Sequence, residues 1–205
     1  MTPDEVLRAI ERAWADATPP EPDELAGRPS RIGEYGYLAG FFRGKRWTDV
    51  DLRSLRDHYP GPHDACLSFM SGGAFRHFLP SYMRIAILDR DAMDSATDAA
   101  VAALTPPRYR PEVDRIAREA HEQMARREPG LDTMALHRAG GTTPEAVSAL
   151  RAWWDDRVAG FTPAQREAIV AFLDLADQSL ADPLAGEALE HWRRQAVSGG
   201  DGTER

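Results

Sequence analysis

The sequence predicts an all-α fold, an irregular bundle of about seven to eight helices around a central helix that is kinked by a proline. Three observations support this prediction. Apolar residues recur at the i, i+3, i+4 and i+7 spacing of amphipathic helices. Threonine followed by proline, a helix-start signal, occurs ahead of three such segments. No segment alternates apolar and polar residues with the β-branched side chains typical of strands.

The N-terminal segment is expected to be a capped amphipathic helix. Thr2-Pro3 supplies a capping hydroxyl and a proline at the first helical position, and Glu5 completes a capping box. Residues 17–33 follow, and they are rich in proline, glycine and charge. We therefore expect an extended arm at the surface after this helix.

Residues 35–47 concentrate aromatic and basic side chains, with a glycine at every fourth position. Mixtures of aromatic and cationic residues are typical of binding surfaces. The candidate binding residues in this patch are Tyr35, Tyr37, Arg43, Lys45, Arg46 and Trp47. A short core-packing segment with a basic edge explains the same residues, and the sequence favours that interpretation because most aromatic side chains are buried.

A short helix is predicted over residues 49–58, and it leads into a Pro-Gly-Pro turn. His58 and His63 flank this turn, with aspartates nearby, but their spacing is not that of a known metal site. Cys66 is the single cysteine and lies in an apolar run, so we expect a buried, unreactive thiol. We predict neither a metal site nor a cofactor.

The central helix is predicted over residues 71–88, SGGAFRHFLPSYMRIAIL, with Ser71 as its N-cap. Its apolar stripe consists of Phe75, Phe78, Leu79, Tyr82, Met83 and Ala86. The opposite side carries the polar residues Arg76, His77, Ser81 and Arg84, and Pro80 lies on that side too. A proline here removes the hydrogen bond to the Arg76 carbonyl. Placed toward solvent, it would bend the helix around the core.

Two interpretations of this polar side are open. The freed carbonyl and the residues Arg76, His77 and Arg84 could form a niche for a ligand or a partner. Alternatively, the helix is simply curved and its basic face is solvated, which is the usual state of exposed charges. The sequence favours the solvated face.

The stretch LSFMSGGAFRHFLPSYM, residues 67–83, resembles the signature LSF(L/M)(S/T)xxAFRxFLPxY of an uncharacterised bacterial domain-of-unknown-function family. FTPAQREAIVAFLDLA, residues 161–176, resembles a second element of that family. Residues 108–158 match nothing in the resemblance and look like an insertion. The resemblance implies a helical fold, and it supplies no activity, cofactor or catalytic residue.

Further helices are predicted along the rest of the chain. One is expected over residues 94–104, and Pro111 opens another, with basic residues suited to its C-terminus. The apolar stripe of this second helix is Val113, Ile116, Ala117, Ala120 and Met124. Thr143-Pro144 and Thr162-Pro163 open two more helices, and a last one is expected over residues 184–196.

Length and linkers predict one helical domain over residues 1–197, since 205 residues suit a single domain. Residues 108–158 are a candidate for an inserted helical subdomain. The segment 129–142 has the composition of a loop and would mark its boundary. Residues 198–205 are expected to be a disordered tail.

The net charge of −8 argues against general nucleic-acid binding and fits a partner that is basic. The N-terminus lacks the apolar core of a signal peptide, and no stretch approaches the ~20 apolar residues of a membrane span. We expect a cytoplasmic protein. The sequence indicates no oligomeric state.

Function follows from these features as three hypotheses. The first is a non-enzymatic protein-interaction domain, with an immunity- or antitoxin-like role as one concrete version, because the chain is acidic and carries no catalytic motif. The second is an enzyme or small-molecule binder with a pocket at Pro80, in which His77 is the acid/base and a carboxylate converges on it. The third and weakest is nucleic-acid binding by a positive face over residues 28–56.

Overall fold

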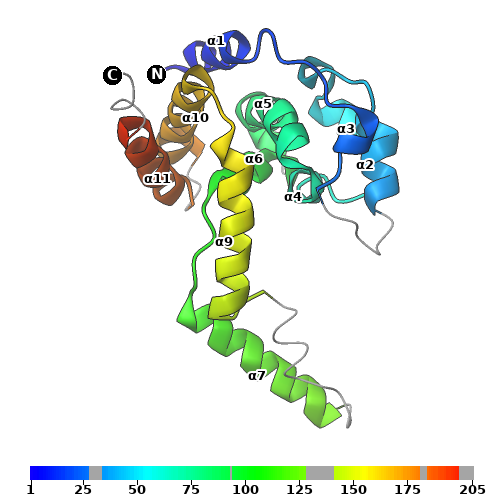
Figure 1. The fold of residues 1–205 in the computed structure, drawn as a ribbon, viewed down its shortest axis with the longest axis vertical. Coiled ribbons are helices and arrows are strands. Elements are labelled where there is room, and N and C mark those ends of the chain that lie inside the picture. The colour runs from blue at the N-terminus through cyan, green and yellow to red at the C-terminus, as the bar shows by residue number, and fades with distance from the viewer. Residues whose placement is uncertain (28–33, 93, 128–140, 181–183, 199–205) are drawn as a thin grey trace, which may run out of the picture. The chain divides into compact units, whose positions relative to one another are not determined.

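The computed structural model describes most of the chain, and the described part is mostly helical (Figure 1). The described residues are 1–27, 34–92, 94–127, 141–180 and 184–198. Within these ranges the chain forms ten α-helices and no β-strand, apart from one isolated bridge between Ala26 and Met70. The all-α prediction is confirmed, with more helices than the predicted seven to eight.

The chain divides into two compact units, one of residues 1–105 with 157–205 and one of residues 106–156. The helices of the first unit are α1 (Pro3–Ala13), α2 (Glu34–Phe42), α3 (Leu52–His58), α4 (Ala65–Phe69), α5 (Gly72–Leu88), α6 (Ala96–Leu104), α10 (Pro163–Leu175) and α11 (Ala185–Ser198). The second unit contains α7 (Pro111–Arg127) and most of α9 (Pro144–Ala159), whose last three residues belong to the first unit. That residues 108–158 are an insertion stays a prediction.

The threonine-proline starts form the caps that the sequence predicts. Thr2 and Thr162 each make a complete capping box, with Glu5 and Gln165 as the return partners. The Thr143 hydroxyl accepts a hydrogen bond from the Ala146 amide at 3.2 Å. These bonds satisfy amides that the first turn of a helix leaves without a partner.

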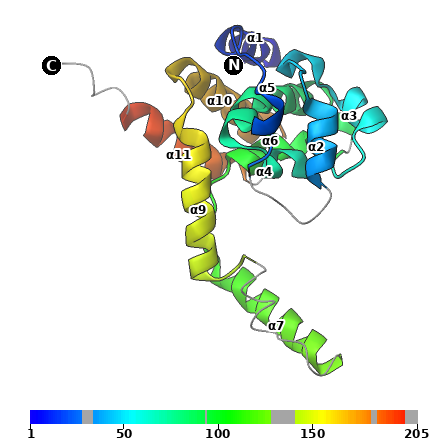
Figure 2. The ribbon, with the colours of Figure 1, turned by 45° about the vertical axis from the view of Figure 1, so that its right-hand side comes forward.

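Helix α5 lies at the centre of the first unit, with α10 and α11 on one side and α2 and α3 on the other (Figures 1 and 2). Aromatic rings connect these layers. The Phe161 ring packs edge-on against Trp14, Phe75 and Trp192, with ring centroids 5.8 to 6.2 Å apart. Because these rings come from the C-cap of α1, from α5 and from α11, the core joins both ends of the chain around α5.

The second unit is built differently, because α7 and α9 do not pack along their lengths (Figure 1). Its helices therefore cover each other's apolar residues only in part. Across the described residues, no helix is both long and apolar enough to cross a membrane.

Candidate functional site

The polar side of α5 is largely covered, which corrects the expectation of a solvated face. Pro80 and Ser81 are buried, and His77 is only 5% exposed. Arg76 and Arg84 are half-buried. The prediction that Pro80 lies toward solvent is therefore wrong. The reason is tertiary: α1 and the short 3-10 helix Trp47–Asp49 cover this side.

The carbonyl that Pro80 frees is taken by a tryptophan. The indole Nε1 of Trp14 donates to the Arg76 carbonyl oxygen at 2.7 Å. Proline has no N–H, so this carbonyl lacks its usual donor four residues along the helix. The indole supplies that donor from the C-cap of α1, so this carbonyl keeps a hydrogen bond where the helix is interrupted.

Two more hydrogen bonds extend this arrangement to the covering segment. The indole Nε1 of Trp47 donates to the Trp14 carbonyl at 3.1 Å, and the Ser81 hydroxyl donates to the Trp47 carbonyl at 2.6 Å. The sequence left open that the freed Arg76 carbonyl forms part of a binding site for a ligand. In the structure these groups bond to one another and hold α1, α5 and the Trp47 segment together.

Arg76 also has a structural partner. Its Nη1 donates to the Arg157 carbonyl at 2.9 Å, and a Cβ added at Gly160 would meet its guanidinium at 2.7 Å. Arg157 itself is buried, donates to the Leu67 carbonyl and stacks 3.9 Å from the Phe75 ring centroid. Burial lowers the pKa of Arg157 to about 9. No motif in the sequence singled out Arg157, because its partners lie 82 and 90 residues away.

His77 does not have the surroundings of an acid/base catalyst. Burial lowers its pKa, and the backbone of Lys45 and Thr18 opposes this effect in part. Its ring nitrogens are buried and make no hydrogen bond of good geometry. The groups that act on its pKa belong to the backbone, so the carboxylate that the enzyme hypothesis requires is not among them.

The aromatic and basic patch is only partly at the surface. Trp47 is buried, and Lys45 is half-buried with its Nζ 3.3 Å from the centroid of the Phe41 ring. Arg84 stacks over the Trp47 ring at 5.5 Å. Gly44 lies between the end of α2 and Lys45, and its φ is +67°, a conformation that glycine adopts without strain.

The exposed members of the patch are Tyr37, Arg43 and Arg46. Arg46 forms an ion pair with Asp49 at 3.2 Å. The side chain of Tyr35 lies outside the described residues. The patch is thus mainly a packing segment with a basic edge, and the binding role of its exposed residues stays a prediction.

His63 joins an ion-pair cluster that contains none of the other residues considered for a metal. Its Nδ1 lies 3.1 Å from Asp94 Oδ1, and Arg56 Nε lies 2.8 Å from Asp94 Oδ2. Desolvation raises the pKa of Asp94, but hydrogen bonds from the Ala96 amide, Arg56 and His63 outweigh it and lower the pKa to about 2. Within the described ranges, no three His, Cys, Asp or Glu residues are grouped so that they could hold a metal ion.

Cys66 is buried in the core, as the apolar run indicated. Desolvation raises the pKa of its thiol to about 11. The thiol is therefore protonated at neutral pH, which makes it a poor nucleophile.

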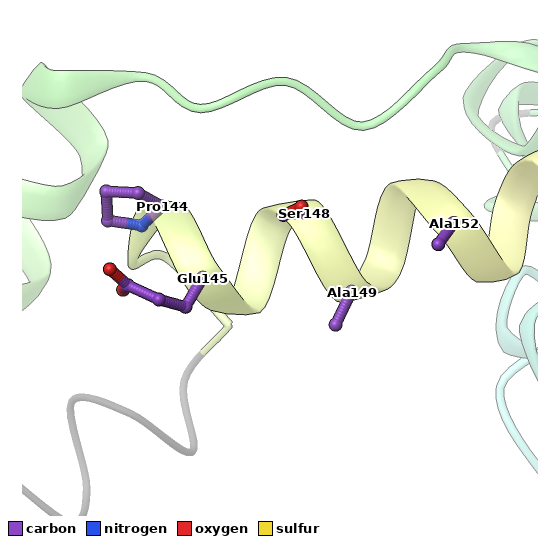
Figure 3. A pocket seen from close by; sticks show the side chains of 5 residues that line it. All are labelled: Pro144, Glu145, Ser148, Ala149 and Ala152. Carbon is purple, nitrogen blue, oxygen red and sulfur yellow. The ribbon is translucent and has the colours of Figure 1, made fainter.

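Two hollows on the surface of the described residues carry few functional groups. One lies on α9 and is lined by Pro144, Glu145, Ser148, Ala149 and Ala152, all exposed (Figure 3). Another lies between α1 and α10. Glu145 is the sole ionisable residue that lines the first hollow, and His77 lines neither. Neither hollow has the convergent polar groups of a catalytic pocket.

The exposed apolar side chains, by contrast, gather in the second unit. Among the described residues eight large apolar side chains are exposed, and five of them belong to residues 106–156. These five are Tyr109, Val113, Ile116, Met124 and Leu150. A unit of 51 residues thus holds most of the exposed apolar side chains.

Helix α7 carries three of these residues on one side. We call this side the α7 face; it consists of Val113, Ile116, Ala117, Ala120 and Met124. Val113, Ile116 and Met124 are 43%, 56% and 47% exposed. The sequence predicted this stripe, and in the described part of the chain its large side chains are exposed. Contiguous exposed apolar residues are typical of protein–protein contact sites.

Comparison with known proteins places the chain in a family. A model of a family of unknown function, DUF6714, matches residues 2–158, which is more than three quarters of the chain. The match includes residues 108–158 and ends before the second motif at 161–176. Searches of curated proteins and of solved structures found no match. The chain belongs to the DUF6714 family.

Proposed function

We propose that this member of the DUF6714 family is a non-catalytic protein-interaction domain that binds through the α7 face. The observation that carries the proposal is the exposure of an apolar stripe along one side of a helix. A helix in a globular protein normally buries such a stripe against another element. An exposed stripe flanked by charged residues matches the helix-in-groove and helix-pair modes of protein recognition.

The interior of the first unit supports a non-catalytic role. The groups that the enzyme hypothesis placed in a pocket at Pro80 are engaged in the core: the Arg76 carbonyl with Trp14, and the Arg76 side chain with Arg157. His77 is buried among backbone groups. These groups therefore serve to hold the fold together.

An immunity- or antitoxin-like role is one concrete form of this proposal, with a basic toxin as the partner. Its support is the distribution of charge. Residues 1–105 and 157–205 together contain 24 acidic and 17 basic residues, whereas residues 106–156 contain nine and eight. A basic partner would thus be attracted to the acidic first unit. A bacterial setting fits the motif resemblance of residues 67–83.

A pull-down that compares matched variants tests the proposal. The bait is the full-length chain, and Ile116→Glu introduces a charge in the middle of the α7 face. The control is Leu88→Glu, which makes the same change at an apolar residue of the first unit that is 59% exposed. We expect wild type and Leu88→Glu to retain a partner from a lysate of the source cells, and Ile116→Glu to lose it. Equal retention by all three would show that the α7 face does not bind protein.

A further inference from the structure

We propose that the α7 face binds a second copy of this chain, with the two α7 helices packed antiparallel. This inference rests on the proposed function and names the partner of the same surface. It is carried by the charge pattern of α7 together with the exposure of its apolar stripe. Both the charge pattern and the apolar stripe belong to helix α7, which lies within the second unit.

The apolar stripe has the width and length of a helix–helix seam. Its five residues fall within about 100° of the helix circumference, which is the width of a core-facing stripe. The helix has 17 residues and is thus about 25 Å long. Ala117 and Ala120 lie at its middle, where small side chains let two helix axes approach closely.

The charges at the ends of α7 select the orientation. The first turn carries Glu112, which is exposed, and Asp114, which is buried and pairs with Arg118. The last turn carries Arg126 and Arg127, both exposed. In a parallel pair, acidic ends would meet acidic ends and basic ends would meet basic ends. In an antiparallel pair, Glu112 of one copy lies near Arg126 and Arg127 of the other, at both ends of the seam. Opposed helix dipoles favour the same orientation.

The charge balance explains why a copy is a suitable occupant. Helix α7 contains four acidic and four basic residues. An interface between two such helices is therefore neutral overall, although the chain as a whole carries −8. Two chains of this net charge repel one another elsewhere, so contact is least opposed at the neutral helix α7.

The apolar seam is short, so the dimer is expected to be weak. Interfaces at the small end of the range belong to transient contacts. We expect a dissociation constant in about the micromolar range. Light scattering on the full-length chain from about 1 to 500 µM should show the mass rising from 22.7 kDa toward twice that value. Ile116→Glu should remain monomeric throughout, and Leu88→Glu should follow wild type.

Cysteine cross-linking tests the orientation. In the antiparallel pair, residue 113 of one copy faces residue 124 of the other. Residues 113 and 124 are separated by about 16 Å along the helix, well beyond disulfide reach. With Cys66→Ala as the background, a mixture of Val113→Cys and Met124→Cys chains should form a mixed disulfide. Each variant alone should cross-link at least ten times more slowly.

Three outcomes would overturn the proposal. A monomer at every concentration would exclude the dimer. Faster self-cross-linking of Val113→Cys than of the mixture would exclude the antiparallel arrangement. A monomer that still loses another protein partner on Ile116→Glu would refute the second copy as occupant, while the α7 face would remain a protein-binding surface. The failure of this inference is thus distinguishable from failure of the proposed function.

Discussion

The hydrogen bond from Trp14 to the carbonyl that Pro80 frees can be tested by a double-mutant cycle. Trp14→Phe removes the indole donor and leaves the partly buried Arg76 carbonyl without it. A buried acceptor left unsatisfied costs about 1–3 kcal/mol of the free energy of unfolding. The smaller ring adds a packing cost, which is present in any background.

The second substitution of the cycle restores a donor from the helix itself. Pro80→Ala introduces a backbone N–H at the position that normally bonds the carbonyl four residues earlier, which is that of Arg76. In this background Trp14→Phe should lose its hydrogen-bond penalty and keep only the packing cost. We therefore expect Trp14→Phe to cost about 1–2 kcal/mol less in Pro80→Ala than in wild type.

The assay is urea unfolding followed by far-ultraviolet circular dichroism for the four chains of the cycle. The cost of Pro80→Ala itself cancels in the comparison. Trp192→Phe is the matched control, because its indole donates to the Leu104 carbonyl at 2.9 Å, a bond that Pro80 does not affect. Its cost should be equal in both backgrounds, within about 0.5 kcal/mol. If Trp14→Phe is equally costly in both backgrounds, the freed carbonyl is not what Trp14 stabilises.

Three further predictions concern groups outside this cycle. Asp94 has a pKa lowered from 3.8 to about 2, so its charge stabilises the fold above about pH 4, and this contribution is lost as the pH falls through 2. Asp94→Asn should lower the free energy of unfolding by at most about 2.5 kcal/mol at pH 7. In the variant, the free energy of unfolding measured with urea should fall less between pH 5 and pH 2 than in wild type. An equal fall in both chains would contradict this role of Asp94. Gly160→Ala should lower the midpoint of thermal unfolding by a few degrees, because the added Cβ lies 2.7 Å from the Arg76 guanidinium. A midpoint equal to that of wild type would show that the Arg76 side chain moves aside. Cys66 should react with a thiol reagent only on unfolding, since its thiol is buried with a pKa raised to about 11; rapid labelling of the native chain would refute this.

The local elements of this protein follow from its sequence. Helix starts were predictable because a capping hydroxyl, a proline and a glutamate or glutamine act within four residues, as at Thr2 and Thr162. The apolar stripes of α5 and α7 were predictable for the same reason, since helical spacing depends only on near neighbours. Helices α2 and α4 were not predicted, because they are short and lack such caps.

The role of Pro80 was decided by tertiary structure. Sequence alone placed it on the polar side of α5 and showed that the Arg76 carbonyl would lose a hydrogen bond. It could not show that Trp14, 62 residues away from Arg76, supplies the replacement, or that Trp47 closes over Ser81. A helical pattern tells which face is polar, and only the packing of distant segments tells whether water reaches that face.

The α7 face is the opposite case, an apolar side of a helix that stays exposed. The sequence determined that Val113, Ile116 and Met124 share one side of a helix, because 3.6 residues complete each turn. Only the tertiary structure showed that this side stays exposed in the chain. An apolar stripe records that burial is favourable but carries no information about which surface provides it, since the hydrophobic effect has no direction. For this protein the caps and stripes are therefore local properties of the sequence, and whether a stripe or a polar face is covered was decided by contacts across the fold.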